Sequence, residues 1–165
     1  MTETSGGRVG IVMGSRSDMA AADKAAAVLR ELGVESEIRV ISAHRAPALL
    51  TRYAESVRER RIGVLIAIAG LAAHLPGVLA AQTTIPVVGL PMPGGVMDGL
   101  DALLSVVQMP KGVPVATVGV GNAENAALLA AQILAVGDSG LAERFAARRA
   151  AAAQAILEDP ANEGL

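Results

Sequence analysis

The stretch Arg8–Met13 reads RVGIVM, and Gly14 ends it. A short apolar run rich in β-branched residues is typical of a strand buried on both faces, as in a parallel sheet. Helix-forming residues follow over Asp18–Leu32, and Gly33 stands where a glycine that caps a helix C-terminus is expected. This first strand and helix therefore favour an α/β fold.

The same alternation continues along the chain. Further strands are predicted at Glu37–Ile41, Gly63–Ala69, Ile85–Leu90 and Pro114–Val120, and further helices at Pro47–Arg60, Leu75–Ala81, Leu100–Val107, Asn122–Ala135 and Ser139–Leu157. The last helix carries an apolar stripe made of Leu141, Phe145, Ala152 and Ile156. We expect a three-layer α/β/α sandwich with a central parallel sheet, flavodoxin-like or Rossmann-like, and a C-terminal helix. One domain is expected over residues 1–165, with an ordered core at about 8–157.

Composition excludes several classes of protein. The 165 residues include no cysteine and only two histidines, so a disulfide framework is excluded and a metal site is not expected. A net charge of -2 without a basic run does not favour nucleic-acid binding. The longest apolar stretch, Val64–Ala73, is too short to cross a membrane, and residues 1–7 lack the pattern of a secretory signal. We therefore expect a soluble cytoplasmic protein.

In sheets of this kind, ligands bind beyond the carboxyl ends of the strands, which directs attention to four segments there: Gly14–Asp18, Ser42–Pro47, Gly70–Gly77 and Pro91–Gly99. The glycine-rich stretch Met92–Gly99 of the fourth segment is assigned no specific contact. The first loop is Gly14–Asp18, with the sequence GSRSD. A glycine permits a tight turn, and the hydroxyls of Ser15 and Ser17 at a helix N-terminus suit a phosphate. Asp18 would repel a phosphate but could accept hydrogen bonds from sugar hydroxyls. The alternative is that Ser17 or Asp18 only caps the helix.

The second loop, Ser42–Pro47, reads SAHRAP. Arg45 at a strand end offers a bidentate grip on phosphate, and His44 can take or give a proton near neutrality. Pro47 stiffens the entry to the following helix and so supports both side chains. Taken by itself, a loop of this composition is more often only a solvated polar segment.

The third loop, Ala69–Gly77, reads AGLAAHLPG. Its small residues let a ligand lie close to backbone amides. A lone histidine in an apolar stretch is more often a hydrogen-bonded structural residue than a catalyst, so His74 is expected to be structural or to line the site in a secondary role. The motifs of nicotinamide enzymes, P-loop nucleotidases and serine hydrolases are absent. The residues themselves predict binding of a phosphorylated sugar compound, with proton chemistry available.

Five segments in order resemble the class I PurE family, the N5-carboxyaminoimidazole ribonucleotide mutases of bacterial purine synthesis. They are VMGSRSD (Val12–Asp18), ISAHRAP (Ile41–Pro47), AGLAAHLPG (Ala69–Gly77), SVVQMPKGVPVATVGVG (Ser105–Gly121) and NAALLAAQIL (Asn125–Leu134). The resemblance extends from about Val9 to Leu157, which is nearly the whole chain.

This resemblance implies a small-molecule reaction, the transfer of a carboxylate from the exocyclic nitrogen of an imidazole ribonucleotide to ring carbon C4. It implies no metal, ATP, biotin or other cofactor, and a homo-octamer with the C-terminal helix as a contact element. It makes His44 the general acid and base. The residues that it implies in substrate binding are Ser15, Ser17, Asp18, Ser42, Ala43, Arg45, Gly70, Leu71, Ala72, His74 and Leu75.

Among these, the serines and Arg45 would surround the phosphate, Asp18 would hold the ribose, and Gly70–Leu75 would wall a carbon dioxide pocket. One departure concerns Leu71, which stands where many members have glycine, and it would be costly if the backbone there needs a positive φ. Three alternative functions of the chain remain open at this point. They are direct carboxylation with free carbon dioxide (class II), a non-catalytic flavodoxin-like module binding FMN or another phosphorylated ligand, and an inactive scaffold.

Overall fold

The computed structural model describes residues 7–164, so the expectation on a secretory signal falls largely outside the described residues. Its centre is a parallel sheet of five strands in the order β2-β1-β3-β4-β5. The strands are β1 (Arg8–Met13), β2 (Ser36–Val40), β3 (Ile62–Ala69), β4 (Val87–Pro91) and β5 (Ala116–Thr117). This is the doubly wound order of flavodoxin-like folds, which confirms the predicted parallel sheet.

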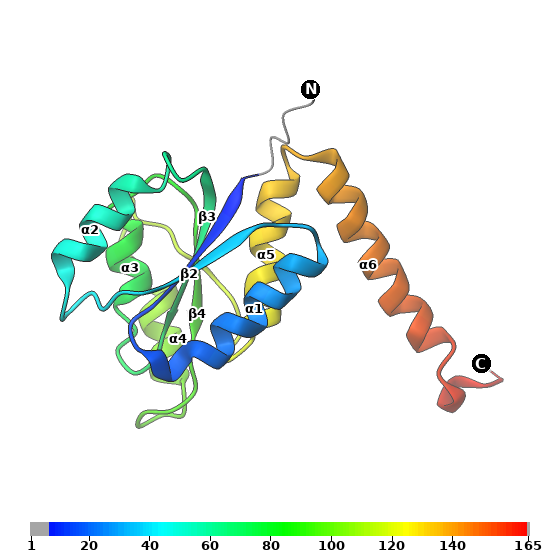
Figure 1. The fold of residues 1–165 in the computed structure, drawn as a ribbon. Coiled ribbons are helices and arrows are strands. Elements are labelled where there is room, and N and C mark those ends of the chain that lie inside the picture. Colours follow the sequence, from blue (N-terminus) through cyan, green and yellow to red (C-terminus); the bar gives the residue numbers. More distant parts are fainter. Residues whose placement is uncertain (1–6, 165) are drawn as a thin grey trace.

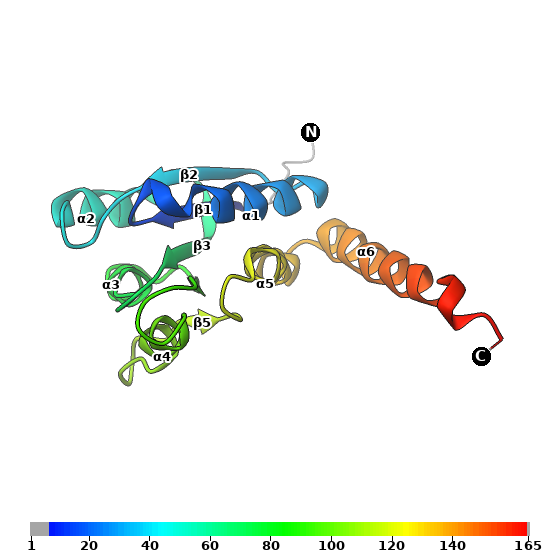
Figure 2. The ribbon, with the colours of Figure 1, turned by 90° about the horizontal axis from the view of Figure 1, so that it is seen from below.

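Helices cover both faces of the sheet (Figure 1). One face carries α1 (Met19–Glu31) and α5 (Ala123–Ala135), and the other carries α2 (Pro47–Ser56), α3 (Leu75–Ala80) and α4 (Leu100–Val107). A short 3-10 turn, η1 (Arg16–Asp18), leads into α1, and a second, η2 (Pro160–Asn162), follows α6 (Ser139–Leu157). Figure 2 shows the sheet edge-on between the two groups of helices. The predicted three-layer sandwich is therefore confirmed.

The apolar runs of the central strands serve both faces. In β1, Ile11 and Met13 belong to the core under α1 and α5, whereas Val12 belongs to the core under α2 and α3. All three side chains are fully buried. Because successive side chains of a strand point to opposite faces, only a strand covered on both sides needs an uninterrupted apolar sequence.

Two elements are shorter than predicted by several residues. The strand expected at Pro114–Val120 is reduced to β5, where Ala116 and Thr117 pair with β4 alone. Proline lacks a donor and glycine weakens a strand, and at the sheet edge no second neighbour compensates. Helix α2 ends at Ser56 instead of Arg60, because the chain turns there and Arg61 takes a φ of 59° just before β3.

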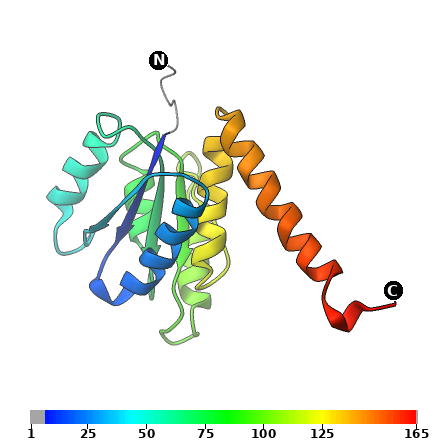
Figure 3. The same cartoon turned by 45° about the vertical axis from the view of Figure 1, so that its right-hand side comes forward.

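Helix α6 has the predicted bounds but not a fully buried stripe. Leu141 and Phe145 are buried, whereas Ile156 is 65% exposed and Leu157 is 71% exposed. Beyond its first turns the helix leaves the body of the molecule and projects away from it (Figures 1 and 3). Its apolar C-terminal half thus contacts little else within residues 7–164. In this part of the chain, no helix combines the length and hydropathy that a bilayer-spanning segment requires.

Candidate active site

A cavity of about 640 Å³ lies at the carboxyl edge of the sheet, where the loops after β1, β2, β3 and β4 converge. All twelve residues singled out in the sequence line it: Ser15, Ser17, Asp18, Ser42, Ala43, His44, Arg45, Gly70, Leu71, Ala72, His74 and Leu75. The structure adds Gly14, Ala69, Ala73, Met92 and Pro93 to the wall. The four loops are therefore one site geometrically, and the role of each side chain stays a prediction.

Arg45 connects the first two loops. Its Nη2 donates to the Gly14 carbonyl at 2.9 Å, and its Nε donates to the Ser42 hydroxyl at 3.3 Å. The Ser42 hydroxyl also accepts from the Arg45 backbone amide at 3.2 Å. These partners are neutral, so they fix the guanidinium at the cavity wall without cancelling its charge. A beta carbon added to Gly14 would meet nothing within 4 Å, so the space beside this loop is open to a ligand.

The sequence left open that Ser17 or Asp18 only caps the helix, but the capping residue of the first loop is Ser15. The Ser15 hydroxyl, not that of Ser17, accepts from the Ser17 backbone amide at 3.3 Å and caps the 3-10 turn. Asp18 occupies the N-cap position of α1 but makes no side-chain capping hydrogen bond. Partial burial raises the pKa of Asp18, and a hydrogen bond from the Ser17 hydroxyl opposes that rise. Its carboxylate is thus left available to a ligand hydroxyl.

The two histidines of the chain meet in this cavity. His44 Nε2 and His74 Nδ1 are 2.9 Å apart, and the rings lie edge to face with their centroids 5.0 Å apart. A hydrogen bond between two ring nitrogens needs one donor and one acceptor, so each ring sets the tautomer of the other. His74 is thus a hydrogen-bonded residue that also lines the site, directly beside His44. The arrangement provides a proton donor and acceptor of defined orientation at the cavity wall.

The third loop has an unusual backbone. Leu71 has a φ of 56° and Ala73 a φ of 37°, in the region that favours glycine. The positive φ that made Leu71 a concern is therefore present. Leu71 is 64% exposed, and a beta carbon on Gly95 would come within 3.2 Å of its Cδ2. The segment 92–99 therefore passes over the third loop.

Met92 and Pro93 are the wall residues that lie outside the first three loops. Their segment, Met92–Gly99, was assigned no specific contact from the sequence because it is rich in glycine, although it follows a strand at the carboxyl edge of the sheet. That position was the available signal. Around the cavity and elsewhere in residues 7–164, no three His, Asp or Glu side chains gather as a metal site.

We predict that Leu71→Gly raises the free energy of unfolding by about 0.5 kcal/mol. A left-handed conformation costs a leucine about 1–2 kcal/mol, and the larger unfolded-state entropy of glycine offsets about half of that gain. Urea denaturation measures the change. The neighbouring Ala72→Gly is the control, because its φ is not positive and it should lose about 0.5–1 kcal/mol. Equal destabilisation by both substitutions would show that the Leu71 backbone is unstrained.

The fold and the cavity together define a doubly wound α/β protein with a fixed arginine and a histidine pair at the carboxyl edge of its sheet. The model of a known family, described as AIR carboxylase, matches residues 8–155. The chain belongs to this family.

Similar proteins cover nearly the whole chain. An N5-carboxyaminoimidazole ribonucleotide mutase of Bacillus subtilis (strain 168) is 53% identical over 152 residues, which is 91% of this chain and 94% of the relative. A mutase of the same name from Pyrococcus abyssi is 57% identical over 129 residues, 78% of this chain and 74% of the relative. The crystal structure of Treponema denticola PurE aligns with a TM-score of 0.86 at 32% identity, covering 95% and 98% of the two chains. The resemblance to PurE is thereby confirmed.

Proposed function

We propose that this protein is an N5-carboxyaminoimidazole ribonucleotide mutase of purine biosynthesis that acts without a cofactor. The single observation that carries the proposal is the contact between His44 and His74 at 2.9 Å, in the same cavity as Arg45. Relatives 53% and 57% identical that bear this name support the choice of substrate. We place the reaction in the cytoplasm.

Substrate binding follows from the charges at the wall. The phosphate lies against the Arg45 guanidinium and the hydroxyls of Ser15, Ser17 and Ser42, where charge-assisted hydrogen bonds are strongest. Asp18 accepts from the ribose hydroxyls, because its carboxylate is not used in capping. This arrangement directs the imidazole toward the histidine pair and the third loop.

The side-chain ring of His44 performs both proton transfers. The bond between the exocyclic nitrogen and its carboxylate breaks, carbon dioxide leaves, and the nitrogen takes a proton from His44. Ring carbon C4 then attacks the carbon dioxide, and the C4 proton passes to His44. The proton given in the first half is regained in the second, so the cycle needs no external acid or base. His74 holds the His44 ring in position through the shared hydrogen bond.

The third loop serves to retain carbon dioxide. Gly70, Leu71, Ala72 and Ala73 present no side-chain hydrogen-bonding group to the cavity. A wall of this kind offers water few partners, and excluding water strengthens the charge interactions within the site. Carbon dioxide that neither escapes nor reacts with water remains beside C4 for the second half of the reaction.

The test supplies each substrate separately. Purified protein should convert N5-carboxyaminoimidazole ribonucleotide to the C4-carboxylated product in buffer purged of carbon dioxide and bicarbonate. A second candidate, carboxylation of aminoimidazole ribonucleotide with free carbon dioxide, is favoured by the description of the family as AIR carboxylase. Turnover that depends on added carbon dioxide would establish this second activity and refute the mutase.

We also propose a homo-octamer in which the projecting half of α6 is covered by another copy. Its exposed Ile156 and Leu157 support a contact of this kind, because adjacent exposed apolar side chains commonly mark an interface. The double substitution Ile156→Asp with Leu157→Asp is expected to shift the mass measured by light scattering from eight chains to fewer. Gln154→Glu, which adds a charge to the same turn without removing apolar surface, should leave the octamer intact. An unchanged mass in the double variant would exclude this contact.

A further inference from the structure

A second cavity, of about 720 Å³, adjoins the candidate active site at the edge of the sheet. Four arginines line it, and they come from η1, β2, α2 and the turn after α2: Arg16, Arg39, Arg52 and Arg60. The two cavities are neighbours because Arg16 lies between Ser15 and Ser17 of the active-site wall, and Ile41 precedes Ser42. We call this second space the arginine cavity.

Positive charge in the arginine cavity is largely uncompensated. Glu37 forms ion pairs with Arg39 and Arg60, each at 3.0 Å, but it does not line the cavity itself. Arg16 and Arg52 make no ion pair or side-chain hydrogen bond within residues 7–164. No carboxylate stands in the wall, although the whole chain has a net charge of -2. A concave wall with charge of one sign concentrates the local field.

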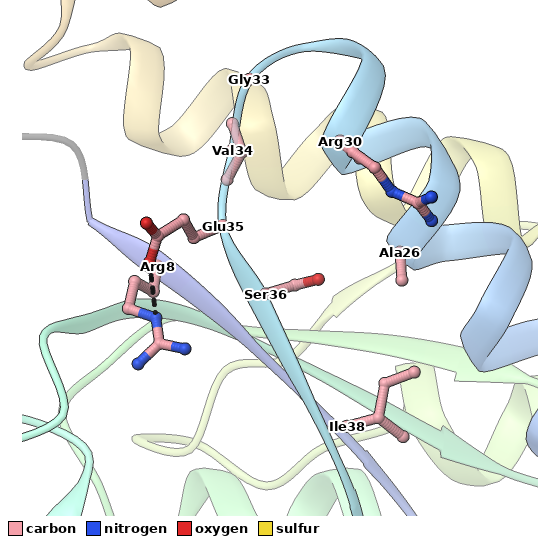
Figure 4. A pocket seen from close by; sticks show the side chains of 8 residues that line it. All are labelled: Arg8, Ala26, Arg30, Gly33, Val34, Glu35, Ser36 and Ile38. Atoms are coloured by element: carbon pink, nitrogen blue, oxygen red, sulfur yellow. Dashed lines mark ion pairs between the residues drawn. The ribbon is translucent and has the colours of Figure 1, made fainter.

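A hollow at the other end of β2 also contains arginines, but a carboxylate in its wall offsets part of their charge (Figure 4). It measures about 750 Å³ and is lined by two arginines, Arg8 and Arg30. Arg8 Nε lies 3.2 Å from a carboxylate oxygen of Glu35, which also lines this hollow and offsets the charge of Arg8. Only Arg30 remains without an ion pair there. Most of the uncompensated positive charge along β2 thus lies at the end next to the active site.

We propose that the arginine cavity is an anion site that receives the phosphate of the substrate before the molecule moves into the active-site cavity. The inference rests on the proposed function, because the substrate is then a phosphorylated carboxylate. Guanidinium groups bind phosphate in a bidentate manner. The one aromatic residue in the wall, Tyr53, is only 5% exposed and offers a base no face to stack on. Recognition in this cavity is therefore of the anionic group alone.

The test reverses one charge at a position outside the active-site wall. Arg52→Glu is expected to lower kcat/KM about 10-fold at low ionic strength and to leave kcat unchanged, because steering of a charged substrate acts on encounter. Within residues 7–164 Arg52 makes no ion pair or side-chain hydrogen bond, so its substitution removes neither from the fold. The difference from the unaltered protein should shrink at high salt, where charges are screened. The matched control is Arg30→Glu, which changes net charge equally at the far end of β2 and should have little effect.

A direct binding measurement uses inorganic pyrophosphate as the probe. With the active site saturated by product, calorimetric titration should show a pyrophosphate site in the full-length protein that is lost in Arg52→Glu and kept in Arg30→Glu. Glu37→Gln adds one positive charge near the cavity and should tighten this binding. Equal kcat/KM values for the two arginine variants, or unchanged pyrophosphate binding, would overturn the proposal. A change in oligomer mass in Arg52→Glu alone would also overturn it, because the cavity would then hold a second copy.

The two proposals fail in distinguishable ways. If the protein lacks mutase activity, the proposed function is wrong, but the titration still measures whether pyrophosphate binds in the arginine cavity. If the protein is an active mutase with a salt-independent kcat/KM, the proposed function stands and the anion site is refuted.

Discussion

Replacement of His44 by asparagine is expected to lower kcat by about 10³-fold or more, while the product dissociation constant changes only a few-fold. Positioned acid–base groups contribute about 10²–10⁴-fold to a rate, and in the proposed cycle the same ring transfers a proton in both halves. Asparagine keeps a polar group of similar size but cannot exchange a proton near neutrality. Binding persists because Arg45 stays fixed by Gly14 and Ser42.

Steady-state kinetics and product titration by calorimetry separate these two effects. His74→Asn is the matched comparison, since it removes the other half of the 2.9 Å contact. Its expected loss in kcat is about 10-fold, because a freed His44 ring still transfers protons but spends less time in the productive orientation. Weak binding together with slow turnover in His44→Asn would assign His44 to substrate binding. An equal loss in both variants would make the pair, and not His44, the acid–base unit.

The second large effect is expected from Arg45→Gln, which should raise KM and the product dissociation constant by about 10²-fold. A hydrogen bond to a charged group contributes about 1.5–3 kcal/mol, so the loss of two such bonds to the phosphate costs at least about 3 kcal/mol, which corresponds to about 10²-fold. The substitution also leaves the Gly14 carbonyl without its 2.9 Å partner, which loosens the first loop. The reacting atoms are unaffected, so kcat should fall far less than kcat/KM.

Arg45→Lys tests whether the charge or the planar shape of the Arg45 side chain determines KM. Lysine keeps the positive charge but cannot bridge the Gly14 carbonyl and the Ser42 hydroxyl as the planar guanidinium does. An increase in KM of about 10-fold, intermediate between wild type and Arg45→Gln, is expected from initial rates at varied substrate concentration. If KM is unchanged in Arg45→Gln and only kcat falls, the phosphate lies elsewhere.

Most of the fold was predictable because local patterns and the final environment agree. The β1 sequence is apolar at every buried position, and the proline at the start of α2 and the glycine after α1 mark boundaries that the structure keeps. The predicted bounds are wrong where the neighbouring elements determine how long a strand or helix becomes. Strand β5 has one partner strand only, so Pro114 and Gly119 outweigh an apolar sequence that would suffice in the centre of a sheet.

The candidate site was likewise predictable in part. The three loops could be selected because parallel strands end at one edge of the sheet, and their residues do line one cavity. The contact between His44 and His74 could not be predicted, since it depends on the positive φ angles of Leu71 and Ala73 that turn the third loop. The participation of Met92 and Pro93 depends likewise on how the loop after β4 folds back.

Tyr53 is the only tyrosine of a chain without tryptophan, and its ring lies in the wall of the arginine cavity. All tyrosine fluorescence of the folded protein therefore originates at a single known point, so quenching on addition of pyrophosphate would report occupancy there without an attached dye. Burial, together with the negative charge of Glu37, raises the pKa of the Tyr53 phenol. In urea solutions at about pH 11, above the ordinary phenol pKa of about 10, absorbance of the ionised phenol should therefore rise as molecules unfold, and it would follow the unfolded fraction directly.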